Sequence, residues 1–137
     1  MPITGGCLCG AVRYVISEAP LAARTCWCRL CQYLGAGSGT VNAVFRRGSV
    51  AIAGILQHYD SLAESGNHMC RQFCGQCGTQ VCGYAEERPE VIVIRVGTLD
   101  DQEAIRPTST IWVSAAPTWA CIDTTLPQIL AQPPPVG

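Results

Sequence analysis

Hydrophobic and polar positions alternate along much of the chain with the two-residue period of a β-strand. In the segment 11–16, Val12, Tyr14 and Ile16 fall on one face, and the segment 40–45 has a similar pattern. The same criteria predict further strands at 50–53, 57–59, 68–73, 80–84, 91–96 and 110–113. Glycine or proline occupies most of the gaps between these segments. Short strands at this spacing predict an all-β fold of packed sheets, in a sandwich or barrel-like arrangement.

Helical signals are few and short. Residues 29–34 predict one or two helical turns that end at Gly35, and residues 125–131 predict another that the following prolines stop. The chain contains no linker-like stretch, and it has no internal repeat at a period of about 20–50 residues. We therefore expect a single β domain at residues 1–131, followed by a proline-rich tail at residues 132–137 that frays.

Composition narrows the possible functions. All nine basic residues are arginines, which excludes a Schiff-base lysine and the lysine of a phosphate-binding P-loop. The net charge of −1 gives no basic excess for nucleic acid, and the longest aliphatic run, residues 91–94, cannot span a membrane. The N-terminal residues show no export signal. We therefore expect a cytoplasmic protein whose thiols bind metal or do chemistry instead of forming disulfides.

Seven of the ten cysteines fall into three tight groups. The groups are Cys7 and Cys9; Cys26, Cys28 and Cys31; and Cys74 and Cys77. The remaining three, Cys70, Cys82 and Cys121, stand alone, and we expect them to be small buried hydrophobic residues.

The last group has the C-x-x-C-G pattern of a zinc knuckle. In such a turn, backbone N–H groups donate to the two sulfurs, and the flanking glycines supply the unusual φ angles. Two thiolates satisfy only half of a tetrahedral zinc ion, and Cys7 and Cys9 are the best source of the other two. We therefore predict a closed, structural zinc site of Cys7, Cys9, Cys74 and Cys77, which joins the N-terminal strand to the later sheet.

The middle group offers three thiolates within six residues, immediately before the predicted helix at 29–34. Three protein ligands and a vacant position are typical of a catalytic zinc ion, and a thiol substrate could take the vacancy as a thiolate. We therefore predict that Cys26, Cys28 and Cys31 are catalytic residues of an open, labile zinc site. A fourth ligand from Cys70 or Cys82 would instead close that site.

Other uses of these thiols are alternatives. A disulfide between residues i and i+2 is strained, a thioredoxin-like redox pair needs a βαβ setting, and the spacings differ from those of ferredoxins. The middle group could also store metal or sense oxidants. A zinc-stabilised binding module without catalytic activity is the main alternative to an enzyme.

The cysteine groups and their surroundings resemble the glutathione-dependent formaldehyde-activating enzyme family, which also includes centromere protein V. The segments that match contain the three cysteine groups and several stretches downstream. They are residues 6–10, 12–14, 26–31, 73–79, 96–100, 111–113, 117–119 and 126–127. Together they extend over nearly the whole chain. Trp27 stands where the family often has histidine.

This resemblance implies an Mss4-like fold of packed β-sheets stapled by zinc. It implies a closed zinc site at Cys7, Cys9, Cys74 and Cys77 and a second, three-cysteine zinc site at Cys26, Cys28 and Cys31. The implied activity is that of a carbon–sulfur lyase, with glutathione and formaldehyde in equilibrium with S-hydroxymethylglutathione. The implied partners are therefore a small thiol and an aldehyde.

Single residues add candidates for such a reaction. The candidates for a proton donor, besides water, are Tyr33, His58 and His68. The candidates for holding carboxylates of a peptidic thiol through forked hydrogen bonds are Arg24, Arg71 and the pair Arg46–Arg47.

Overall fold

The computed structural model describes residues 2–137 as a mainly β protein with few, short helices. The strands are β1 (Ile3–Gly6), β2 (Arg13–Ile16), β3 (Ala22–Cys26), β4 (Thr40–Arg46), β5 (Val50–Ala53), β6 (Leu56–Leu62), β7 (His68–Cys74), β8 (Gln80–Ala85), β9 (Val91–Arg95) and β10 (Ser109–Ile111). The α-helix α1 spans Arg29–Leu34, and 3₁₀ turns span Arg47–Ser49, Val96–Thr98 and Val113–Ala115. Within these residues, no helix has the length and apolar character needed to cross a bilayer.

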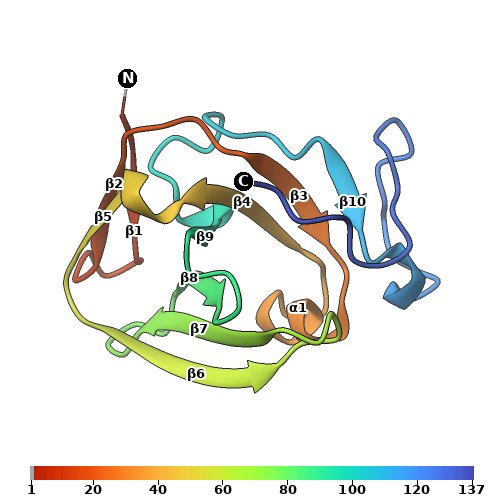
Figure 1. Ribbon diagram of the computed structural model, residues 1–137, viewed down its shortest axis with the longest axis horizontal. Helices are drawn as coiled ribbons and strands as arrows, with labels where there is room; N and C mark the ends of the chain where they lie inside the picture. The colour runs from red at the N-terminus through yellow and green to blue at the C-terminus, as the bar shows by residue number, and fades with distance from the viewer. Residues whose placement is uncertain (1) are drawn as a thin grey trace.

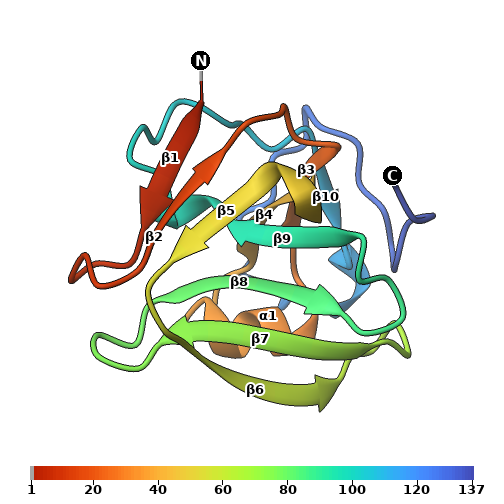
Figure 2. The ribbon, with the colours of Figure 1, turned by 60° about the vertical axis from the view of Figure 1, so that its left-hand side comes forward.

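The strands form two sheets, which agrees with the predicted all-β fold of packed sheets. The smaller sheet has the order β1–β2–β5, and the larger has the order β10–β3–β4–β9–β8–β7–β6 (Figure 1). Neighbouring strands are antiparallel except β10, which runs parallel to β3. Figure 2 shows β1, β2 and β5 grouped on one side of the larger sheet, whose strands β9, β8, β7 and β6 follow one another.

Every predicted strand segment overlaps an observed strand, and helix α1 has the predicted bounds. Strands β1 and β3 were not predicted. The helix predicted at residues 125–131 is wrong, because this segment adds to the edge strand β10 instead. Gln128 forms a parallel bridge with Thr110, and the Ile129 N–H donates to the Thr110 carbonyl at 2.8 Å.

The central strands β4 and β9 place alternate side chains on opposite faces of the larger sheet. On one face, Phe45 and Ile94 are fully buried in a core that also takes residues from the smaller sheet. On the other face, Asn42, Val93 and Arg95 line a pocket. The two-residue period of a strand therefore separates the residues that hold the sheets together from those that can meet a ligand.

The segment after β9 attaches the larger sheet to the smaller one. Leu99 is buried and forms an antiparallel bridge with Gly5 of β1. Asp100 accepts a hydrogen bond from the Thr4 hydroxyl at 2.7 Å, and both terminal nitrogens of Arg13 donate to its carboxylate. These contacts give a structural reason for the motif at residues 96–100.

The proline-rich end of the chain makes two polar contacts. The Trp112 indole donates to the Gln132 side chain at 2.9 Å, and Arg88 donates to the Val136 carbonyl at 2.6 Å. The domain boundary at residue 131 and the fraying of the residues that follow it stay predictions.

We expect the Asp100→Asn substitution to cause a modest loss of stability at neutral pH and almost none near pH 2. The Arg13 guanidinium, with the Thr4 hydroxyl, lowers the pKa of Asp100 to about 2. An unfolded aspartate titrates near pH 3.9, so the stabilisation is fully present above about pH 4 and is lost as the pH falls toward 2. Urea unfolding of both proteins across this range measures the difference.

The neighbouring Asp101→Asn substitution is the control, because among residues 2–137 the Asp101 carboxylate accepts a hydrogen bond only from the nearby Glu103 N–H. Equal effects of the two substitutions would contradict a specific role for Asp100.

Candidate metal centres and the adjoining pocket

Two turns, one from each sheet, bring four cysteine sulfurs together. Cys7 and Cys9 lie between β1 and β2, and Cys74 and Cys77 lie at the turn from β7 to β8. All four Sγ atoms lie within 4.8 Å of one another, with 3.6 Å between Cys7 and Cys9 and 3.8 Å between Cys9 and Cys74. A tetrahedral zinc ion with Zn–S bonds of about 2.3 Å has an edge of about 3.8 Å. The donor set and its spacing therefore fit zinc.

Nearby hydrogen-bond donors favour the ionised form of two of these sulfurs, those of Cys7 and Cys77. The Val12 N–H donates to Cys7 Sγ at 3.2 Å. The Thr79 hydroxyl lies 3.2 Å from Cys77 Sγ and accepts from the Leu8 N–H at 3.1 Å, so its own proton can point at the sulfur. Hydrogen bonds from the Thr79 side chain and backbone lower the pKa of Cys77 to about 5. Thiolates are the form that binds a metal ion.

The middle cysteine group assembles where strand β3 ends and helix α1 begins. Cys26 is the last residue of β3, Cys28 caps the helix, and Cys31 lies in its first turn, with its N–H donating to Cys28 Sγ at 3.3 Å. The three Sγ atoms lie within 4.8 Å of one another. Trp27, between the first two cysteines, is buried and lies close to Gly39.

The three sulfurs of this group shift one another's pKa values in opposite directions. Hydrogen bonds from Cys26 and Cys28 lower the pKa of Cys31 well below its ordinary value. The same contacts raise the pKa of Cys26, because a second thiolate would be repelled by the first. A bound dication would stabilise all three thiolates, so this donor set also fits zinc.

The lone cysteines lie outside this group. Cys82 is fully buried in the main core, and Cys70 is buried on β7 beside His58 and Asp60. Neither joins the three-cysteine group. The expectation of burial holds for these two and is wrong for Cys121, which is exposed in a segment without regular secondary structure.

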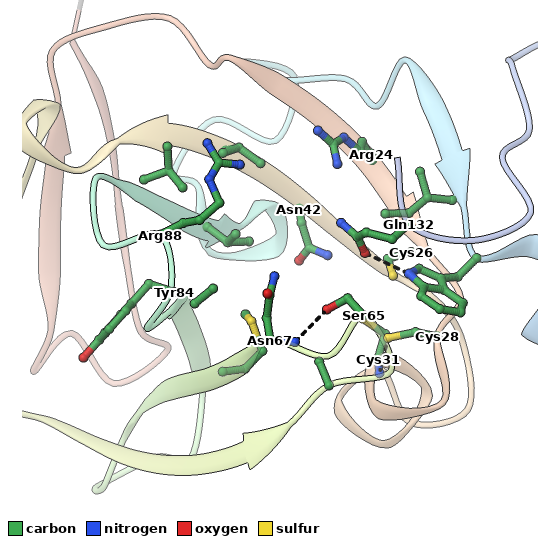
Figure 3. Close-up of a pocket in the computed structure, with 18 of the residues that line it drawn as sticks. Arg24, Cys26, Cys28, Cys31, Asn42, Ser65, Asn67, Tyr84, Arg88 and Gln132 are labelled. Carbon is green, nitrogen blue, oxygen red and sulfur yellow. Dashed lines mark hydrogen bonds between the residues drawn. The ribbon is translucent and has the colours of Figure 1, made fainter. Parts of the chain in front are cut away.

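The three-cysteine group borders a pocket of about 190 Å³ (Figure 3). Strands β3, β4, β7 and β9 supply much of its wall, on the side of the larger sheet opposite the core. The arginines along this wall are Arg24, Arg71, Arg88 and Arg95. Glu64 is the acidic residue that lines it, and its carboxylate accepts a backbone N–H at the start of α1 at 2.7 Å. The wall therefore has an excess of positive charge.

Two of these arginines are held in place by neutral partners. Arg71 is 8% exposed and donates to the Ser61 hydroxyl. Arg95 donates to the Asn42 side chain at 2.7 Å, while its Nε is buried with no hydrogen-bond partner among the described residues. Burial lowers the pKa of Arg95. A buried guanidinium with an unused donor favours an anionic ligand.

Of the arginines that the sequence suggested for binding carboxylates, some line the pocket and others do not. Arg24 and Arg71 line the pocket, as does Arg95, which sequence reasoning missed although it ends the apolar run of β9. Neither Arg46, which is exposed, nor Arg47, which lies over the Tyr84 ring at 4.1 Å from its centroid, lines the pocket.

The three side chains considered as proton donors are exposed and lie off the pocket wall. They are Tyr33, His58 and His68. The Tyr33 ring lies beneath the Arg29 guanidinium at 5.3 Å, and His68 pairs with Glu87 at 2.5 Å between Nδ1 and Oε2.

Comparisons with known proteins agree with this arrangement. A protein of Halomonas elongata named "Putative glutathione-dependent formaldehyde-activating enzyme" is 27% identical over 100 residues, which cover 67% of this chain and 62% of the relative. The chain thus spans less than two thirds of that relative. A crystal structure of a Rhodobacter sphaeroides protein matches 76% of this chain and 91% of its own, with 25% identity and a TM-score of 0.57. The family model described as "Glutathione-dependent formaldehyde-activating enzyme" matches residues 2–115, and the chain belongs to this family.

Proposed function

We propose that this protein catalyses the reversible addition of a small thiol to an aldehyde. The description of the family names glutathione and formaldehyde, and in our proposal their product is S-hydroxymethylglutathione. In the direction of cleavage, the enzyme is a carbon–sulfur lyase. The observation that carries this proposal is the group of Cys26, Cys28 and Cys31 at the edge of a pocket with a positively charged wall.

The two cysteine groups have different roles in this proposal. Four thiolates complete a tetrahedral shell, so Cys7, Cys9, Cys74 and Cys77 would hold a structural zinc ion. The group of Cys26, Cys28 and Cys31 includes no fourth cysteine, histidine or carboxylate of residues 2–137. Zinc bound by these three would offer one position to a substrate thiol and lower the pKa of that thiol.

The arginines of the wall bind and orient the thiol substrate. Arg24, Arg71 and Arg95 present donors that suit the carboxylates of a peptide such as glutathione. The hydrogen bond from Arg95 to Asn42 fixes the direction of one guanidinium before the ligand arrives. Orienting the substrate in this way lowers the entropic barrier to addition.

The reaction forms one C–S bond and breaks one C=O π bond, while the thiol loses its proton to water and water returns a proton to the oxygen. The thiolate sulfur adds to the carbonyl carbon, the C–S bond forms, and the π electrons of the C=O bond move to oxygen. The resulting alkoxide takes a proton, which we assign to water because Tyr33, His58 and His68 lie off the wall. Cleavage reverses these steps, with the thiolate as leaving group.

We expect Cys28→Ser to abolish the acceleration of adduct formation, because a hydroxyl replaces one of the three thiolates. Exchange between free formaldehyde and S-hydroxymethylglutathione, followed by NMR at equilibrium, measures the rate. Cys121→Ser, at an exposed lone cysteine, is the matched control and should keep full activity. A wild-type protein that fails to accelerate exchange would favour the non-catalytic binding module.

We expect the two cysteine groups to differ in their effect on stability. Cys77→Ser should lower the free energy of unfolding by about 4 kcal/mol or more, because binding of a structural metal contributes directly to folding. Cys28→Ser should give a folded protein with one metal fewer. Circular dichroism and elemental analysis measure both properties. Equal unfolding of the two variants would contradict separate structural and reactive sites.

We expect Arg24→Gln to raise the KM for glutathione about tenfold, equivalent to about 1.4 kcal/mol of lost binding. The rate with an uncharged thiol such as N-acetylcysteamine should change little, because that thiol has no carboxylate. Arg46→Gln, at an exposed arginine off the pocket, is the control. A similar loss with both thiols would argue against carboxylate recognition by Arg24.

A further inference from the structure

A third group of potential metal ligands lies on strands β6 and β7, outside both cysteine groups. Asp60 and Cys70 stand directly opposite each other in the antiparallel register of these strands. His58 lies two residues before Asp60, so the two side chains share one face of the sheet. The ligand atoms of His58, Asp60 and Cys70 all lie within 4.8 Å of one another.

This group faces away from the pocket already described. On β7, Met69 and Arg71 line the pocket, and Cys70 lies between them on the alternating position. His58, Asp60 and Cys70 are absent from the pocket wall. The proposed chemistry of the pocket therefore does not use them.

The donor set selects the class of metal. An imidazole nitrogen, a carboxylate oxygen and a thiol sulfur together suit zinc and similar late divalent ions, whereas calcium and magnesium prefer oxygen alone. Tetrahedral zinc with such ligands requires separations of about 3.3–3.8 Å between ligand atoms. The separation between His58 Nδ1 and Asp60 Oδ1 is 3.3 Å.

The exposure of each side chain indicates how the three ligands would come together around an ion. Cys70 is 5% exposed and is fixed by pairing on both sides, with β6 and with β8. The side chains of His58 and Asp60 are 62% and 54% exposed, so they can rotate toward the sulfur without disturbing packed neighbours. One buried anchor and two mobile ligands would make a site that exchanges metal with solvent.

We propose that His58, Asp60 and Cys70 form a third site, which binds a zinc-like divalent ion at the surface of the β6–β7 hairpin. With three protein ligands, the site would leave a position for water or for a ligand from solution. The proposal is independent of the activity assigned to the pocket.

Titration of zinc-loaded protein tests this proposal. After desalting removes loosely bound metal, calorimetry with added Zn²⁺ should detect one equivalent more in the wild-type protein than in Cys70→Ser, which keeps both cysteine groups. His58→Ala and Asp60→Asn should each weaken this binding at least tenfold, since each removes one of three ligands. Co²⁺ in place of Zn²⁺ should give a sulfur-to-cobalt absorption band, and the part of that band that belongs to the further equivalent should disappear in Cys70→Ser.

His68→Ala is the matched control. His68 is also an exposed histidine paired with a carboxylate, that of Glu87, and the pair belongs to no three-ligand group of the described residues. This variant should bind the further equivalent as the wild type does. Absence of that equivalent in the wild type, loss of it in His68→Ala, or a cobalt band that is unchanged in Cys70→Ser would overturn the proposal.

Discussion

The meeting of two turns from separate sheets is the constraint on which the arrangement of this protein depends. The turn after β1 and the turn after β7 each bring two cysteine sulfurs to one point. The smaller sheet contributes only three strands and would bury little surface alone. Its other attachments are the shared apolar core and the segment after β9, where Leu99 and Asp100 contact β1 and β2.

The pairing of strands in the larger sheet positions the second cysteine group, Cys26, Cys28 and Cys31. Strand β3 is paired with β4 on one side and β10 on the other, so the place where it ends is well defined. Helix α1 then begins at once, and the change from extended to helical backbone turns Cys28 and Cys31 back toward Cys26. The residues that supply the charged wall come from neighbouring strands of the same sheet. A rigid scaffold of this kind keeps sulfur ligands and guanidinium groups at fixed positions.

Much of this could be predicted from the sequence, and the omissions have physical reasons. Alternation found β2 and β4, but β1 contains two glycines and β3 lacks a run of strong β-formers. Both segments are strands because they pair with neighbouring strands, β1 with β2 and β3 with β4 and β10. A pattern within the segment itself does not reveal such pairing. The segment 125–131 was misjudged for the same reason, since the free edge of β10 determines its conformation.

The cysteine groups could be predicted because cysteines that could hold one metal ion follow close spacing rules in the sequence. Arg95 was missed because its role depends on which face of a central strand meets the pocket.

The separation of 70 residues between Cys7 and Cys77 has a consequence for synthesis of the chain on the ribosome. The hairpin of β1 and β2 emerges before its partners in the four-cysteine group, because Cys74 follows Cys9 by 65 residues, and the segment containing Leu99 emerges later still. Until then, the apolar side chains of β2 and the thiols of the first turn are without their native contacts. This nascent stage exposes apolar side chains that the folded protein buries, and such exposed surface is what chaperones bind.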